Sequence, residues 1–313
     1  MSTNNKIYQE YLSWLSGVRH SLSVENELIE LSQLAGVYRT LVEGQAGSPL
    51  GRFGRFLNIF DVSTVYPFVM AAWAENLNKD EMECILEDLE SYLVRRLLCR
   101  RSTKNYNKLF LSKELRPKGF TLPEVRAFFL GQTSESGDWP LDTDLRAQWL
   151  SRPAYGQIAP GRLVYILTRL EQAQRSRLSE DITINSALTV EHVLPQSWFQ
   201  TWPLTDGSYV SDEFAREARQ HQVLGLHLDP KGREAAQRQN LINTFGNLTL
   251  LTSPLNSSVS NGPFGAKKKA ITDQSALRLN RYFNACESWD EKAILARGEE
   301  LLADATTTWK RPT

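Results

Sequence analysis

Hydrophobic periodicity in the first half of the chain predicts helices. Between residues 24 and 42, apolar side chains recur every three to four residues, and Gly44 follows where such a helix would end. Asn78 is a candidate N-cap for a second long helix, whose acidic residues come early and whose arginines come late, the order that the helix dipole favours. Thr121 and Glu124 suggest a capping box, and Gly131 would end that helix. We therefore expect residues 1–150 to form an α-helical domain.

The pattern changes after residue 179. Short β-branched runs at 182–184 and 188–193 favour strands, and a further short strand is expected at 245–251. Helices are expected at 162–174 and 211–220, and two more should begin at Ser253 and at Pro263. The fold class predicted is therefore mainly α with an α+β element.

Two turn-rich segments, 131–140 and 151–161, separate these patterns and are expected to be loops. We place a domain boundary there, which divides the chain into domains at 1–150 and 151–313.

Composition excludes several classes of protein. The chain has 313 residues, with 36 Lys and Arg against 36 Asp and Glu, so it is not a polybasic nucleic-acid binder overall. No apolar run approaches the roughly 20 residues that span a bilayer, and the N-terminus has no secretory signal pattern. The three cysteines form no CxxC pair. These features predict a cytoplasmic protein with reduced thiols and no membrane partner.

Four polar residues stand at spacings that suit phosphodiester hydrolysis. Glu191 and His192 are adjacent in VEHVLPQSW, and Asn247 and Asn256 lie in GNLTLLTSPLN. A neutral histidine activates water near pH 7, and a hard cation such as Mg²⁺ takes carboxylate and amide oxygens. Neighbouring residues on a strand face opposite sides, so Glu191 and His192 can cooperate only where the strand ends, as Pro195 indicates.

These motifs resemble the HNH, or ββα-metal, nuclease family. EHVLPQS is similar to DHIVPQS in the HNH domain of RNA-guided CRISPR nucleases, and the spacing of the two asparagines matches that domain. The longer pattern EHVLPQSW, GNLTLLTSPLN and SNGPFGAKK, followed by a helix with Trp289, Ile294, Arg297 and Leu301, resembles the C-terminal nuclease domain of GmrSD-type, modification-dependent restriction endonucleases. The resemblance implies a helical domain followed by a ββα-metal nuclease domain.

The resemblance also implies roles for the residues that match. His192 would be the general base, Glu191 and Asn256 would bind Mg²⁺ (with Mn²⁺ able to substitute), and Asn247 would hold the loop that carries the histidine. The resemblance implies DNA as the substrate, including modified phage DNA, in bacterial defence. No DGQQR-like NTPase motif occurs in the sequence, so a modification-sensing NTPase is expected as another subunit or another part of a longer protein.

Two basic segments, residues 95–118 and the lysines at 267–269, are candidate DNA contacts. Residues 95–118 carry nine basic side chains against one acid, and Tyr106 and Phe110 add stacking surfaces. The alternatives are a solvated helix end, or pairing with the acidic residues at 80–90. The candidates are Arg95, Arg96, Arg100, Arg101, Asn261, Lys267 and Lys268.

Two other functions remain open from the sequence. One is a non-catalytic DNA-binding or assembly subunit of a restriction complex whose nuclease motif has lost its activity. The other is an RNase toxin. The GPFGAKKK stretch lacks the full GxxxxGK[ST] pattern, so we do not expect a nucleotide site there.

Overall fold

The computed structural model describes residues 9–10, 12–13, 16–17, 23–111, 114–115, 117–175, 184–259 and 261–313. The chain forms two compact units, one of Met1–Leu86 with Tyr106–Val125, the other of Glu87–Asn105 with Arg126–Thr313. The boundary expected near residue 150 falls inside the second unit. Within the described ranges, no helix is both long and apolar enough to cross a membrane.

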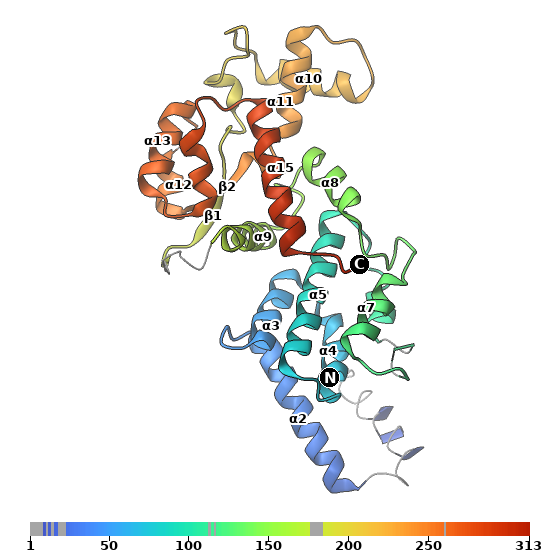
Figure 1. Cartoon of the computed structure of the whole chain (residues 1–313). Helices are drawn as coiled ribbons and strands as arrows, with labels where there is room; N and C mark the ends of the chain where they lie inside the picture. Colours follow the sequence, from blue (N-terminus) through green and yellow to red (C-terminus); the bar gives the residue numbers. More distant parts are fainter. Residues whose placement is uncertain are drawn as a thin grey trace. The chain divides into compact units, whose positions relative to one another are not determined.

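The first unit is helical in the part that the structure describes. Its helices are α2 (Val24–Glu43), α3 (Pro49–Phe60), the 3₁₀ turn η1 (Ser63–Val65), α4 (Tyr66–Ala74), the first turns of α5 (Lys79–Leu98) and α6 (Tyr106–Leu109) (Figure 1). Gly44 ends α2 in the left-handed conformation, and Asn78 caps α5 by accepting from the Glu81 amide. The two helices predicted from these sequence patterns, α2 and α5, are therefore confirmed.

The second unit contains the remaining helices and both strands. Its helices are the rest of α5, most of α7 (Leu122–Leu130), α8 (Asp142–Ser151), α9 (Pro160–Ala173), α10 (Asp212–Val223), α11 (Pro230–Leu241), α12 (Ser253–Val259), α13 (Phe264–Gln274), α14 (Arg278–Arg281) and α15 (Glu291–Thr308). The 3₁₀ turns are η2 (Trp198–Gln200), η3 (Phe245–Asn247) and η4 (Tyr282–Ala285). The helices expected at 162–174 and 211–220 and from Ser253 and Pro263 are confirmed.

Two strands, β1 (Leu188–His192) and β2 (Leu248–Thr252), form the sheet in the described part of the second unit. They pair antiparallel, so that Glu191 lies opposite Thr249 and His192 opposite Leu248. Helix α12 begins directly after β2 and contacts both strands. The strand expected at 182–184 lies almost entirely outside the described residues, and the one expected at 245–251 begins three residues late because η3 occupies 245–247.

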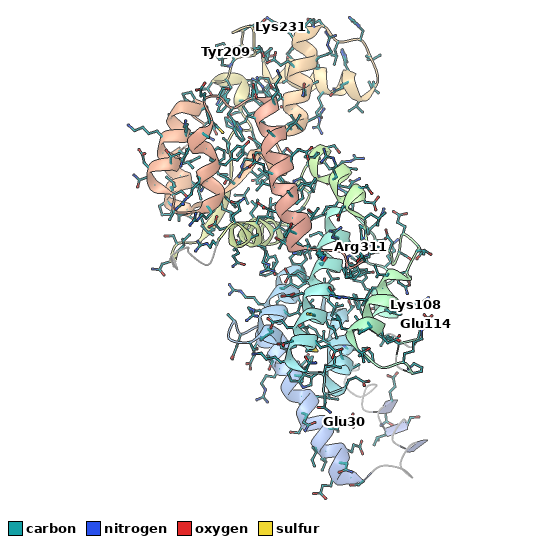
Figure 2. All side chains as sticks on the ribbon, viewed as in Figure 1. Glu30, Lys108, Glu114, Tyr209, Lys231 and Arg311 are labelled. Atoms are coloured by element: carbon teal, nitrogen blue, oxygen red, sulfur yellow. The ribbon has the colours of Figure 1, made fainter. Side chains whose placement is uncertain are left out.

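A long insertion between the two strands carries α10 and α11, which pack on each other. The sequence analysis missed α11, although Asp229 caps it and Pro230 occupies its first turn. Tyr209 and Lys231, both exposed, belong to this insertion (Figure 2).

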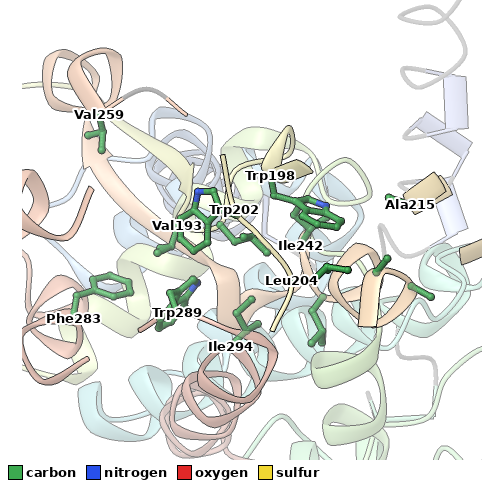
Figure 3. Close-up of a cluster of buried hydrophobic side chains, with 14 of the residues drawn as sticks. Val193, Trp198, Trp202, Leu204, Ala215, Ile242, Val259, Phe283, Trp289 and Ile294 are labelled. Carbon is green, nitrogen blue, oxygen red and sulfur yellow. The ribbon is translucent and has the colours of Figure 1, made fainter. Parts of the chain in front are cut away.

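The buried core of the second unit joins this insertion to the strands. Trp198, Trp202 and Trp289 lie in it together with residues of β2, α11 and α15 (Figure 3). Since the segment directly after β1 contributes Val193 and Leu194 to the same core, the end of β1 has a rigid support.

Candidate active site

His192 is the last residue of β1, and its imidazole is held by Asn243. The Nε2 atom lies 2.9 Å from Asn243 Oδ1, and Gln196 Nε2 donates to the same oxygen at 3.3 Å. An amide oxygen only accepts, so Nε2 of His192 carries a proton and Nδ1 keeps its lone pair. The ring of Tyr155 meets the imidazole edge to face, with the ring centroids 4.4 Å apart. The hydrogen bond to Asn243 therefore leaves Nδ1 as the basic nitrogen of His192.

Burial keeps His192 neutral. Only 8% of the residue is exposed, and this burial lowers the imidazole pKa to about 4, with the positive charge of Lys267 acting in the same direction. The hydrogen bond to Asn243 opposes the shift but does not cancel it. At neutral pH the side chain is therefore an uncharged imidazole able to accept a proton.

Asn247 is fully buried and ties the segment after β1 to its surroundings. Its Oδ1 accepts from the Leu194 amide at 2.8 Å and from Trp289 Nε1 at 3.0 Å. Its Nδ2 donates to the carbonyls of Leu194 and Ile242. All four hydrogen bonds go to protein groups, so the amide fixes the backbone that follows His192.

Helix α15 holds the turn η3, which carries Asn247. The guanidinium of Arg297, 1% exposed, donates to the carbonyls of Gly246 at 2.8 Å and Leu248 at 2.7 Å. Gly246 lies so close to α15 that a Cβ there would come within 2.1 Å of the Ile294 carbonyl oxygen. This contact explains why a glycine precedes Asn247.

Glu191 forms an ion pair with Lys267 of α13. Lys267 Nζ lies 2.5 Å from Glu191 Oε1 and 2.7 Å from the carbonyl oxygen of His192. Lys267 is 1% exposed, so it does not face the solvent as the sequence analysis expected of a DNA contact. That expectation was wrong, because α13 places this side chain beneath the end of β1.

Asn256 on α12 lies on the same side of β1 as Glu191. Its Nδ2 donates to Thr189 Oγ1 at 2.9 Å and to the Val190 carbonyl at 3.3 Å. Side chains two residues apart on a strand share a face, so Thr189 and Glu191 both project toward this helix. Asn256 therefore lies beside Thr189 and Val190, whereas Glu191, His192 and Asn247 lie where β1 ends and β2 begins.

Comparison with protein families bears on this site directly. Residues 139–304 match the family model of the GmrSD restriction endonucleases, C-terminal domain, and the match covers more than half of the chain. The chain belongs to this GmrSD family. A search of curated proteins found no match. The matched region includes β1, β2, α12 and α13, so the residues around His192 lie within the GmrSD domain.

Two of the candidate DNA-binding arginines, Arg95 and Arg96, make hydrogen bonds within the protein. Arg95 donates to the carbonyls of Trp309 at 2.5 Å and Pro140 at 3.1 Å, and Arg96 donates to the Asp138 carbonyl at 2.7 Å. Both are buried, with 1% and 0% exposed. The expectation that they contact DNA was wrong, because these guanidinium groups cross-link loops of the second unit.

Arg100 and Arg101 remain at the surface of this unit, but Arg101 is paired. It binds Asp138 at 3.0 Å, and Glu135 and Asp144 lie within 4 Å of it. Arg100 donates to the Pro153 carbonyl at 3.3 Å. The neutralising acids of the Arg95–Arg101 cluster therefore come from 135–144, while the acidic run at 80–90 pairs elsewhere, as in Asp88 with Arg126 and Glu90 with Arg169.

The other candidates for DNA contact lie near α13. Asn261 is exposed and its carbonyl accepts from Thr201 Oγ1, and Lys268 is partly buried and donates to the Cys286 carbonyl at 2.7 Å. Lys113 and Arg116, which belong to the basic segment 95–118, lie outside the described residues.

Sequence reasoning missed Asn243 and Tyr155. Asn243 binds His192 through its side chain, and its carbonyl accepts from the amides of Ala154 and Tyr155 at 2.7 and 3.1 Å. It therefore joins the loop before α9 to the histidine. Its only signal in the sequence is an asparagine in the turn after a polar helix, and a position of that kind is common in structural turns.

Proposed function

We propose that this chain hydrolyses DNA phosphodiester bonds, with His192 as the general base. The observation that carries the proposal is the neutral imidazole at the end of β1, whose Nε2 is held by Asn243 while Nδ1 keeps its lone pair. A base in this state takes a proton from water without first losing its own. Membership of the GmrSD restriction endonuclease family supports DNA as the substrate.

The pair β1 and β2 followed by α12 supports a ββα arrangement of the HNH kind. In that arrangement His192 ends the first strand, Asn247 precedes the second, and Asn256 lies on the helix. Asn247 then serves as the positioning residue, since its four hydrogen bonds hold the backbone after the histidine.

In this proposal Glu191 and Asn256 would hold a magnesium ion. They supply a carboxylate and an amide, and oxygen donors of this kind suit Mg²⁺ or Mn²⁺. Among the described residues no group of three His, Cys, Asp or Glu could hold a metal, so the protein would supply two oxygens and water the rest. When bound, the ion would stabilise negative charge on the scissile phosphate.

In this scheme each residue has a separate task. His192 Nδ1 accepts the proton of the attacking water, and Asn243 holds the imidazole in the tautomer that makes this possible. The aromatic edge of Tyr155 limits where the ring can rotate. Hydrolysis of this type would leave a 5′-phosphate and a 3′-hydroxyl.

The biological role proposed is restriction of phage or modified DNA together with a modification-sensing NTPase partner or domain. The family supports a role in restriction. The alternatives, a non-catalytic subunit of a restriction complex and an RNase, are separated by the experiment below.

The test is cleavage of supercoiled plasmid by the full chain, with Mg²⁺ and with EDTA, alongside structured RNA as a second substrate. We expect Mg²⁺-dependent nicking or linearisation of DNA. His192→Ala should lower the single-turnover rate on the order of 10²–10⁴-fold, the usual cost of losing a general base. His227→Ala, on the loop before α11, is the matched control and should retain the wild-type rate.

Cleavage of DNA at the wild-type rate by His192→Ala would refute the assignment of the base. A chain that binds DNA but leaves it intact under all metals would point to the non-catalytic subunit. Cleavage confined to RNA would support the toxin.

A further inference from the structure

Lys267 places a positive charge directly on one of the proposed metal ligands. Its ammonium lies 2.5 Å from Glu191 Oε1 and 2.7 Å from the carbonyl oxygen of His192. The side chain of Lys267 is 1% exposed, and that of Glu191 is 13% exposed. The two charges therefore meet in a site that is largely closed to solvent, where an ion pair is screened little by salt.

The same carboxylate thus faces two cations. One is the ammonium already in contact with it, and the other is the divalent ion of the proposed function, on which this inference rests. Lysine is a compact point charge on a flexible four-carbon chain, so its ammonium can move away from a partner without any change in the fold of α13. His192 carbonyl and Glu191 carboxylate supply two of its three hydrogen bonds.

We propose that Lys267 is an internal competitor of the divalent ion at Glu191. In the metal-free protein the ammonium neutralises the buried carboxylate, and the ion binds Glu191 only by weakening or displacing that ion pair. Lys267 thereby keeps the metal affinity of the DNA-free chain low.

An alternative role for Lys267 is to orient Glu191 and so to improve metal binding. The magnitudes favour competition. Repulsion between an ammonium and a divalent ion about 4 Å apart lowers affinity by roughly thirty-fold, even at the dielectric constant of water. Holding one side chain in place contributes about ten-fold at most.

The experiment measures Mn²⁺ binding to the full chain without DNA, by the loss of the free-ion signal in electron paramagnetic resonance. Lys267→Met removes the charge and keeps most of the side-chain volume, whereas Lys267→Arg keeps the charge. Lys269→Met, on the exposed side of the same helix, is the matched control. Glu191→Gln identifies the binding that belongs to this site.

We expect Lys267→Met to bind Mn²⁺ at least about ten-fold more tightly than wild type, with Lys267→Arg and Lys269→Met close to wild type. Equal affinity in wild type and Lys267→Met would overturn the proposal, and weaker binding in Lys267→Met would show the orienting role instead. If no variant binds Mn²⁺ at Glu191, the proposal is likewise overturned.

A second measurement needs no variant and covers the case in which Lys267→Met does not fold. The buried ammonium should give a resolved proton–nitrogen NMR signal in the wild-type protein, and saturating Mg²⁺ should shift or abolish it. A signal that stays unchanged at saturation would exclude competition. The proposed function is judged separately, by plasmid cleavage with and without EDTA, so that cleavage by a chain with an unchanged Lys267 signal would overturn only the present proposal.

Discussion

His192 is buried uncharged, and this affects stability as well as chemistry. Its pKa is lowered to about 4 in the folded chain from an ordinary value of 6.5. Between these values the unfolded chain binds a proton that the folded chain does not, so the stabilising effect of a neutral His192 is complete above pH 6.5 and is lost as the pH falls toward 4. The full effect is on the order of 3 kcal/mol.

We therefore predict that the free energy of unfolding falls more steeply for wild type than for His192→Gln as the pH is lowered from 7 to 4.5. Urea unfolding in EDTA at several pH values measures this difference. Since Glu191 and Asp88 also have raised pKa values, only the difference between the two proteins is diagnostic. Parallel pH profiles would show that His192 titrates normally.

Arg297 is a buried cation whose hydrogen bonds go to backbone carbonyls. It donates to Gly246 and Leu248 and lies 5.0 Å from the centroid of the Phe283 ring, and burial lowers its pKa to about 10. Arg297→Met should destabilise the fold by about 3 kcal/mol, because it leaves these carbonyls without a donor. Thermal and urea unfolding measure the effect, with the exposed Lys292→Met on the same helix as the control. A loss below about 0.5 kcal/mol would contradict this role.

At the scale of elements, the contact between η3 and α15 positions the candidate site. A Cβ on Gly246 would lie 2.1 Å from the Ile294 carbonyl oxygen, whereas a Cβ on Gly298 would first meet a Leu150 side-chain carbon at 3.2 Å. Backbone cannot yield as a side chain does, so Gly246→Ala should cost about 2 kcal/mol or more, and Gly298→Ala less than about 1 kcal/mol.

Activity should separate the same two variants. The turn η3 carries Asn247, so Gly246→Ala should also lower the rate of DNA cleavage at a temperature where it remains folded, while Gly298→Ala should not. Chemical unfolding combined with single-turnover cleavage provides both readouts. Equal stability losses in the two variants would exclude backbone contact as the cause.

At the scale of the whole molecule, the second unit is assembled from separate stretches of chain. Trp149 stacks on Phe245 with ring centroids 3.7 Å apart, and Arg95 donates to the Trp309 carbonyl at 2.5 Å. Trp149 and Phe245 both lie within the matched residues 139–304, whereas Arg95 and Trp309 lie on either side of that match. The second unit therefore includes residues 87–105 and 126–150, which sequence patterns assigned to a separate helical domain.

We predict that a fragment of residues 151–313 does not fold cooperatively, although it contains every residue of the candidate site. Circular dichroism and near-ultraviolet signals during thermal unfolding would show a broad, weak transition compared with that of the full chain. A sharp transition, or cleavage activity in the fragment, would show that the stretches before residue 151 are dispensable.

Local sequence patterns were sufficient to predict many of the helices and strands of this protein. The helix caps at Asn78 and Gly44, the strand that ends at His192, and the helix that carries Asn256 all follow from short-range rules, because caps, periodicity and proline act within a few residues. The motif that contains Glu191, His192, Asn247 and Asn256 was recognisable for the same reason. Its members lie in two short segments.

Burial and pairing were decided only by the tertiary structure. Lysine and arginine side chains have the same appearance in a sequence whether they face solvent or a carbonyl, and Arg95, Arg96 and Lys267 were therefore assigned to DNA. Lys267 meets Glu191 across 76 residues of sequence, and Asn243 meets His192 across 51. Contacts of this range depend on how α11 and α13 pack against the strands, and packing is a property of the folded chain as a whole.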